Sequence, residues 1–391
     1  MSSLALFADR AFLPRGEVHD AAIVIQDDLI ASAGPRREVN VPHDAKRMQF
    51  AGGTIVPGFV DLHVHGAGGH DVMEATPEAL SAIATALACG GTTSFVATTV
   101  TSAPDVLCGS AAGIAGYARL QARPAAGSPP RAEILGVHFE GPFISRERRG
   151  VHPEQWIAAP SLPLFALMCA AAAGTTRILT LAPEAPGAIE LIDAARKAEI
   201  VVSMGHTDAT YEQAMVAVDH GASHAAHVFN AMRPFSHRDS GVLGAVLTCE
   251  HVTAELIADG IHVEPVAMQL LLKAKPNGGV VLVSDGTAAT GMPDGGYRLG
   301  DFDVQVKGGV VRNTDGKLAG SALTLDRALR NMVELGVPLD EAIRMLTVYP
   351  ARVLGIENRK GALAPGSDAD LVVFDEKLNI LRTVTKGAGL N

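Results

Sequence analysis

His63 and His65 stand at the end of an apolar stretch, residues 54–66, that finishes in a glycine. Side chains alternate along a β-strand, so a strand here would place Asp61, His63 and His65 on one face. Two imidazoles in this arrangement can bind one metal ion through facing nitrogens. The alternative is a strand with two incidental histidines, but the pair at a strand end favours a metal site.

Four further residues that can bind a metal follow other apolar segments. Glu140, His206, His227 and Asp285 each come at the end of a short predicted strand. Taken singly, Glu140 could be a solvated loop carboxylate and His206 a loop histidine. The coincidence across several strand ends instead favours one common site. His138, two residues before Glu140, is expected to pack inside the protein rather than bind a metal.

This set of residues suits the hydrolysis of an unactivated amide. A divalent metal lowers the pKa of a bound water and so provides a nucleophile near neutral pH. The ligands expected here are Glu140, His206 and His227 for the principal ion, His63 and His65 for a second ion, and Asp285 at the last strand end. In many barrel hydrolases a carboxylated lysine bridges two metal ions. No predicted strand end here carries a lysine, so Glu140 is expected to bridge instead. Asp285 could take a proton from the water and later pass it to the leaving amine.

The segments between these residues alternate between strand-like and helix-like patterns. Short apolar runs predict strands at 54–66, 93–99, 134–140, 177–182, 200–204, 223–227, 254–258 and 280–283. Helices are expected from Thr76, Ser161 and Thr210, which can cap a first turn, and from Ser102, where Asp105 completes a capping-box pattern. Eight strands, most of them alternating with helices, predict a (β/α)8 TIM barrel with its chemistry at the carboxyl ends of the strands.

The two ends of the chain have a different texture, with short β patterns and polar turns. Residues 1–53 and 361–391 are therefore expected to form a small β-sandwich domain together, while 54–360 form the metal-dependent barrel. Residues 297–317 resemble a β-hairpin inserted after the eighth strand.

Composition narrows the class of protein. The chain has 391 residues, of which 48% are hydrophobic, and a net charge of −10, so a large core is available and a nucleic-acid partner is not expected. The four cysteines form no CxxC pair, which suits a reducing compartment. Asp9 and Arg10 come early and no apolar stretch typical of a secretory signal follows, so none is expected. The most apolar run, 164–173, is too short to span a bilayer. We expect a cytoplasmic protein without a membrane partner.

Several motifs together resemble the N-acetylglucosamine-6-phosphate deacetylases of the amidohydrolase superfamily, over nearly the whole chain. The matching stretches are PGFVDLHVHG at 57–66, HFEGPF at 138–143, TLAPE at 180–184, GHT at 205–207, HVFNAM at 227–232, ADGIH at 258–262, SDGT at 284–287 and AGSA at 319–322. Generic amidohydrolases share only the two paired histidines, two single histidines and the aspartate, so the HxEGP, HxxNAM and ADGxH pieces make the resemblance specific.

The resemblance implies removal of acetate from N-acetylglucosamine 6-phosphate, in amino-sugar catabolism and cell-wall recycling. It assigns proton transfer to Asp285 and polarisation of the acetamide carbonyl to His152. The remaining substrate contacts that it implies are Asn230, the Ala231 backbone N–H, Arg238 and His262 at the phosphate, and Ala319, Gly320 and Ser321 along the sugar. It also implies one or two divalent ions, most simply Zn²⁺ with Fe²⁺ as the alternative. Such enzymes are dimers, in which Arg238 could reach the neighbouring site.

Three alternatives stay open at this stage. The chain could act on the epimer, N-acetylgalactosamine 6-phosphate, or on another N-acyl sugar phosphate. It could be a deaminase or a cyclic amidase of the same superfamily. It could also be a barrel scaffold without catalysis, although such a chain would be expected to have lost ligands that this one retains.

Overall fold

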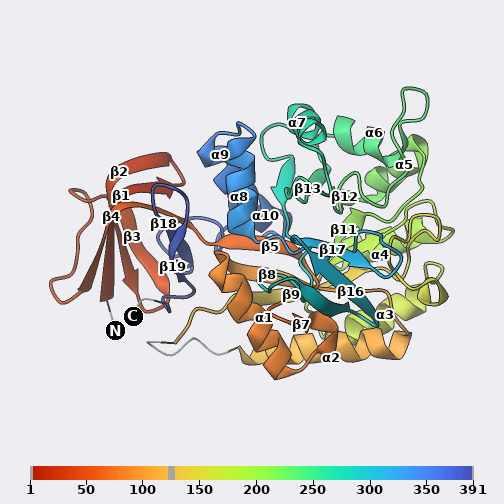
Figure 1. Ribbon diagram of the computed structural model, residues 1–391, viewed down its shortest axis with the longest axis horizontal. Helices are drawn as coiled ribbons and strands as arrows, with labels where there is room; N and C mark the ends of the chain where they lie inside the picture. The colour runs from red at the N-terminus through yellow and green to blue at the C-terminus, as the bar shows by residue number, and fades with distance from the viewer. Residues whose placement is uncertain (1–2, 122–127, 390–391) are drawn as a thin grey trace.

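The computed structural model describes residues 3–121 and 128–389, and a barrel of parallel strands lies at its centre (Figure 1). In spatial order the strands are β14 (Val280–Leu282), β13 (Thr253–Leu256), β12 (Ala222–Ala225), β11 (Val201–Met204), β10 (Thr176–Leu181), β9 (Glu133–Glu140), β8 (Thr92–Thr99) and β5 (Phe59–Val64). A parallel bridge between Val64 and Gly286 joins β5 to the residues that follow β14. The predicted TIM-barrel fold is confirmed.

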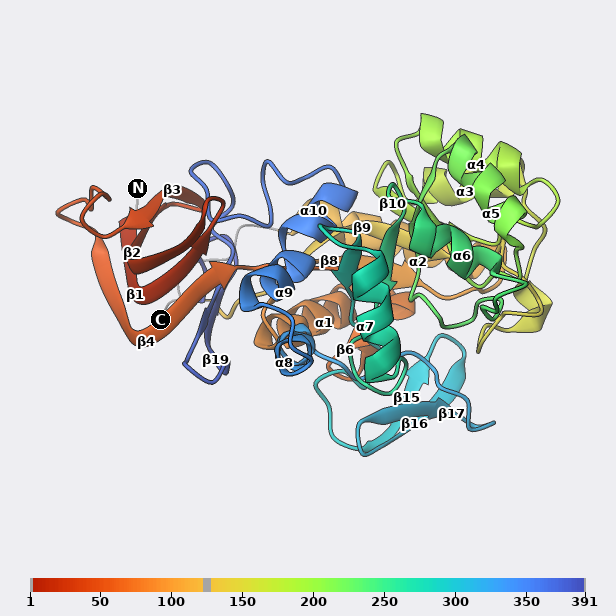
Figure 2. The ribbon, with the colours of Figure 1, turned by 90° about the horizontal axis from the view of Figure 1, so that it is seen from above.

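Helices cover the outside of this barrel (Figures 1 and 2). Their bounds are α1 (Pro77–Cys89), α2 (Pro104–Leu120), α3 (Leu162–Ala171), α4 (Ala188–Lys197), α5 (Tyr211–His220), α6 (Gly241–Thr248), α7 (Pro265–Ala274), α8 (Leu325–Glu334), α9 (Leu339–Leu346) and α10 (Val348–Val353). Because the helices shield the barrel from water, strands such as β5 and β8 are buried at every residue.

The helix starts follow the sequence signals in three cases out of the four named above. Thr76, Ser161 and Thr210 each accept a hydrogen bond from a backbone N–H of the first turn, as predicted. The capping box expected at Ser102 is wrong, because α2 begins at Pro104 and its N-cap residue Ala103 makes no side-chain cap. Proline is favoured at the first helical position, and it moves the start two residues beyond Ser102.

Both chain ends contribute to one six-stranded sheet beside the barrel. Its strands, in spatial order, are β19 (Ile380–Val384), β18 (Leu371–Phe374), β4 (Lys46–Pro57), β1 (Ser3–Leu13), β2 (Gly16–Gln26) and β3 (Leu29–Pro35). In Figures 1 and 2 this sheet lies at the left. Strand β4 leads through Gly58 directly into β5, so this sheet connects to the first strand of the barrel.

A smaller antiparallel sheet follows the last barrel strand. It consists of β15 (Gly295–Leu299), β16 (Phe302–Lys307) and β17 (Val310–Asn313), one strand more than the predicted hairpin. Its apolar face packs against Val100 and Ala289, which follow β8 and β14. This inserted sheet therefore lies over the carboxyl ends of the barrel strands (Figure 2). The short elements β6 (Gly66–Ala67), β7 (His70–Asp71), η1 (Val72–Glu74) and η2 (Glu154–Trp156) complete the fold. Within the described residues, no helix has the length and apolarity needed to cross a membrane.

Candidate metal centre and active site

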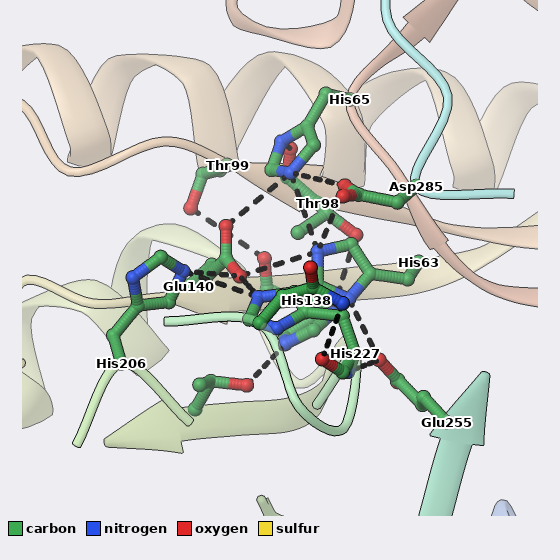
Figure 3. A network of polar contacts seen from close by, with 12 residues as sticks. His63, His65, Thr98, Thr99, His138, Glu140, His206, His227, Glu255 and Asp285 are labelled. Carbon is green, nitrogen blue, oxygen red and sulfur yellow. Dashed lines mark hydrogen bonds and ion pairs between the residues drawn. The ribbon is translucent and has the colours of Figure 1, made fainter. Parts of the chain in front are cut away.

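Side chains from the carboxyl ends of four other strands converge on Glu140, the last residue of β9 (Figure 3). Its Oε1 atom lies 2.9 Å from His227 Nε2, 3.2 Å from His206 Nε2 and 3.3 Å from His63 Nε2. Its Oε2 atom lies 3.3 Å from His65 Nε2. Asp285 Oδ1 closes the group at 3.3 Å from His65 Nε2. Every ligand predicted from the sequence is therefore in one buried cluster.

The backbone turns sharply where the ligands leave the strands. His206, His227 and Asp285 have φ angles of 46°, 27° and 50°, in the left-handed region that non-glycine residues seldom adopt. His227 was expected as the last residue of a strand, but β12 ends at Ala225 and His227 lies in the turn beyond it. Such conformations concentrate at functional sites, where the surrounding structure maintains them.

In two of the ligand rings, hydrogen bonds at Nδ1 leave the Nε2 lone pair facing inward. Nδ1 of His65 lies 3.0 Å from the carbonyl oxygen of Thr98, and Nδ1 of His206 lies 2.9 Å from that of Arg148. A carbonyl oxygen can only accept, so the proton sits on Nδ1 in both rings. The Nε2 atoms of His63 and His65 are 3.2 Å apart, and those of His206 and His227 are 3.1 Å apart.

This donor set fits a divalent metal. Three groups of donor atoms are close enough to share an ion, namely His63 with Glu140 and His227, His63 with His65 and Asp285, and Glu140 with His152 and His206. Imidazole nitrogen and carboxylate oxygen are ligands that both zinc and iron accept. Two of the groups share Glu140, and the two oxygens of its carboxylate could serve two neighbouring ions.

The carboxylates make this centre favour positive charge. Burial opposes a charge on His65, but hydrogen bonds to Asp285 and Glu140 outweigh burial and raise the pKa of His65 to about 9. Burial also opposes a charge on His63, yet Glu140 and Glu255 raise its pKa well above the usual value. Burial alone would raise the pKa of Glu140, but imidazoles, His63 first, hold it well below its usual range. A cluster that attracts protons this strongly also suits a divalent cation, which competes for the same lone pairs.

Two buried histidines beside the cluster behave differently from the ligands. His138 lies between the hydroxyl groups of Thr98 and Thr180, and burial lowers its pKa to about 3, so it packs as a neutral ring, as expected. His152 accepts a hydrogen bond at Nδ1 from the backbone N–H of Thr101, at 3.2 Å. Its proton is therefore on Nε2, which points at Glu140 Oε2 from 3.2 Å. Although His152 falls into one of the donor groups, this tautomer makes it a hydrogen-bond donor rather than a metal ligand.

A cavity of about 220 Å³ opens onto the cluster. It is lined by His65, Val100, Glu140, Gly150, Val151, His152, His206, His227, Asn230, Ala231, His262, Asp285, Leu299, Leu318 and Gly320. Most predicted substrate residues are thus around one space, part of whose wall comes from the inserted sheet. A larger cavity, of about 680 Å³, lies between the terminal sheet and helices α9 and α10, but no residue of the metal cluster lines it.

Three of the predicted substrate residues do not line this cavity. Arg238 is exposed on the loop before α6. Ala319 and Ser321 are buried. Ser321 lies behind the residues that line the cavity. Its backbone N–H donates a hydrogen bond to the carbonyl oxygen of Asp285 at 2.7 Å and so helps to hold the Asp285 peptide.

The sequence interpretation missed Glu255, a fully buried carboxylate in β13. It contacts His63 at 2.9 Å (Figure 3). It also contacts His224 on β12, at 3.0 Å. Burial opposes its charge, but His63 and His224 hold its pKa well below the usual range. A signal was present, since a glutamate within an apolar parallel strand needs a partner. The sequence alone could not name that partner.

Comparison with known proteins agrees with this geometry. The sequence profile of the amidohydrolase family matches residues 54–389. The chain belongs to the amidohydrolase family. The match covers all eight barrel strands and every ligand in the cluster. The protein is thus an enzyme of the hydrolase class, as the sequence predicted.

Individual amidohydrolases match over nearly the full length. The N-acetylglucosamine-6-phosphate deacetylase of Bacillus subtilis (strain 168) is 35% identical, over 99% of this chain and 97% of its own. The N-acetylgalactosamine-6-phosphate deacetylase of Escherichia coli O157:H7 is 37% identical, over 98% of each chain. A solved structure of a Mycobacterium smegmatis N-acetyl-D-glucosamine-6-phosphate deacetylase mutant, in complex with N-acetyl-D-glucosamine-6-phosphate, superposes with a TM-score of 0.92 at 34% identity, over 100% of this chain and 99% of that one. The predicted resemblance to this group of amidohydrolases is confirmed.

Proposed function

We propose that this amidohydrolase hydrolyses the acetamide of N-acetylglucosamine 6-phosphate, releasing acetate and glucosamine 6-phosphate. The observation that carries the proposal is the pairing of an ionised aspartate, Asp285, with a neutral imidazole donor, His152, across one metal-binding cluster. The relatives named for this reaction, which match over nearly the whole chain, support the substrate. We propose zinc as the ion, with iron as the alternative, at one or two positions per chain.

Asp285 has the properties of a general base. Burial would raise its pKa, but the hydrogen bond from His65 and the charge of nearby imidazoles outweigh burial and lower the pKa below its usual value. The carboxylate is therefore ionised at neutral pH and can accept a proton. It can then return that proton to the amine as the C–N bond breaks. A divalent ion in the cluster would supply the Lewis acidity that makes water a nucleophile near neutral pH.

His152 is suited to stabilising the negative charge that develops on the acetamide oxygen. Burial, and the proximity of His206, lower the pKa of His152 to about 4, so the ring is neutral at physiological pH. Its Nε2–H is oriented by the Nδ1 contact with Thr101 before any substrate arrives. A donor fixed in advance costs little reorganisation when charge forms on the substrate.

The phosphate would lie at the other end of the cavity. Asn230, Ala231 and His262 line that space, and His262 is held by Asp259, at 2.7 Å from Nδ1. No lysine or arginine is among the described residues that line it. A phosphate dianion is best matched by a guanidinium, so we propose that the exposed Arg238 reaches the site of a neighbouring subunit in a dimer.

Acetate release tests the proposal. Wild-type chain saturated with zinc or iron should release acetate from N-acetylglucosamine 6-phosphate, and Asp285→Asn should be slower by about 10²- to 10⁴-fold, because the base is lost. Asp303→Asn, at an exposed aspartate of β16, should match the wild type. The galacto epimer is the comparison substrate, since the E. coli relative is named for it. A silent wild type, or a preference for the galacto epimer, would contradict the proposed substrate. Full activity in Asp285→Asn would contradict the proposed base.

A further inference from the structure

Glu255 connects two of the ligand-bearing strand ends. Its Oε2 atom lies 2.9 Å from His63 Nδ1 and 3.1 Å from the backbone nitrogen of His227. Its Oε1 atom lies 3.0 Å from His224 Nε2. A carboxylate only accepts, so all three contacts are hydrogen bonds donated to Glu255. The side chains of Glu255, His63 and His224 are fully buried.

The placement of this charge has no structural advantage apart from these contacts. Removing a carboxylate from water costs several kcal/mol, to order of magnitude, unless good hydrogen bonds compensate. An apolar residue at this fully buried position of β13 would avoid that cost. The compensation comes from one ring and one peptide that belong to the metal cluster, and from His224, which lies outside it.

Each contact restricts the geometry of a ligand. A hydrogen bond from His63 Nδ1–H fixes the tautomer whose Nε2 lone pair faces Glu140 and His65. The bond from the His227 N–H holds a peptide whose φ angle of 27° is unfavourable for a histidine. His63 belongs to two of the three donor groups, and His227 to one of these two. One carboxylate thus acts on both groups that contain His63.

We propose that Glu255 is a positioning residue for metal binding: it orients His63 and the His227 peptide, and thereby sets the affinity of the ion that depends on His63. The inference rests on the metal-binding part of the proposed function and on no property of the substrate. Partners of metal-bound histidines at the second ring nitrogen typically change metal affinity by about 10- to 100-fold. Glu255 should have an effect of this size without touching the ion.

Glu255→Gln tests this with little change of volume. The amide keeps one accepting oxygen but loses the negative charge, so the hydrogen bonds from His63 Nδ1–H and the His227 N–H become weaker, neutral ones. Zinc content and zinc affinity are measured on the metal-depleted, reloaded chain against a competing chelator. We expect the His63-dependent ion to bind about 10- to 100-fold more weakly than in the wild type. Unchanged content and affinity would overturn the proposal.

Two further variants separate positioning from packing. Glu250→Gln makes the same chemical change at an exposed glutamate five positions earlier, and it should bind zinc as the wild type does. His224→Gln disturbs only the Oε1 side of Glu255, so the contacts to His63 and His227 persist and zinc affinity should also persist. If His224→Gln weakens zinc binding as much as Glu255→Gln, general packing of β13 explains the effect and the proposal fails.

A measurement on the wild type covers the case in which Glu255→Gln does not fold. Two-bond ¹H–¹⁵N correlation spectra of the zinc-loaded chain report which ring nitrogen of His63 carries a proton. We expect the proton on Nδ1, protected from solvent exchange, and a proton on Nε2 would overturn the proposal. Neither readout uses substrate. A chain that fails to release acetate but gives these results would lose the proposed substrate and keep the role of Glu255.

Discussion

Lys360 offers a sharp test of how the terminal sheet is joined to the barrel. Its side chain is 1% exposed, and Nζ lies 2.6 Å from Glu133 Oε2, 2.8 Å from Asp368 Oδ2 and 2.5 Å from Asp370 Oδ2. Glu133 begins barrel strand β9, whereas the two aspartates lead into β18 of the terminal sheet. Lys360→Met keeps a side chain of similar length but leaves three carboxylates, two of them buried, without this cation. We expect a large loss of stability.

The magnitude follows from the structure in two ways. Burial alone would raise the pKa of Glu133, but Lys360 first, and then Arg359 and Lys386, lower it from 4.5 to about 2. A shift of that size corresponds to about 3 kcal/mol of stability, an upper value for Lys360 because the other two cations share it. Removing one partner from a buried ion pair typically costs about 3–5 kcal/mol. We therefore expect Lys360→Met to lower the free energy of unfolding by about 3 kcal/mol at pH 7.

Urea unfolding followed by circular dichroism measures this loss on the metal-saturated chain. Lys377→Met, at an exposed lysine of the terminal sheet region, is the control and should change stability by less than about 0.5 kcal/mol. The contribution of Glu133 is fully present above pH 4.5 and is lost as the pH falls through about 2, so the difference between Lys360→Met and the wild type should shrink over that window. A loss below about 1 kcal/mol at pH 7, or one that grows in acid, would refute the reasoning.

Two other predictions concern the site. The pKa of His65 is raised from 6.5 to about 9, so its stabilising contribution is complete below pH 6.5 and is lost as the pH rises through about 9. In thermal scans with a chelator, the melting temperature of the metal-free chain should therefore fall as the pH increases across this window. Zinc affinity should rise over the same window. A melting temperature independent of pH would contradict this. Arg238→Ala should reduce kcat/KM for the phosphorylated sugar by about 10- to 100-fold, as loss of a charged hydrogen bond implies, and leave the unphosphorylated sugar unaffected. Arg382→Ala, at an exposed arginine of β19, is its control, and an equal effect of Arg238→Ala on both sugars would remove this residue from the phosphate site.

Much of the fold could be predicted because the signals are local. Each barrel strand is a short apolar run, and capping residues such as Thr76 and Thr210 act within a single helical turn. The predicted ends of most strands and the starts of most helices therefore lie within one or two residues of the observed ones. The capping box at Ser102 failed because a proline two residues later competes for the helix start. The prediction that His227 ends a strand was wrong. The turn after β12 depends on contacts with β13, including the one to Glu255, and local sequence does not encode these contacts.

The chemical role of each histidine could not be predicted from local sequence, because the backbone group that contacts its Nδ1 atom determines that role. His65 and His152 are both buried rings beside Glu140, and sequence gives them the same donor atoms. The residues at and after the end of β8 separate them: the carbonyl group of Thr98 takes the Nδ1 proton of His65, while the N–H of Thr101 occupies Nδ1 of His152. One ring therefore presents a lone pair at Nε2 and can bind a metal, whereas the other presents an N–H and can stabilise an oxyanion. The sequence alone could not have made this division, since it depends on whether the carbonyl group of Thr98 or the N–H of Thr101 faces each ring.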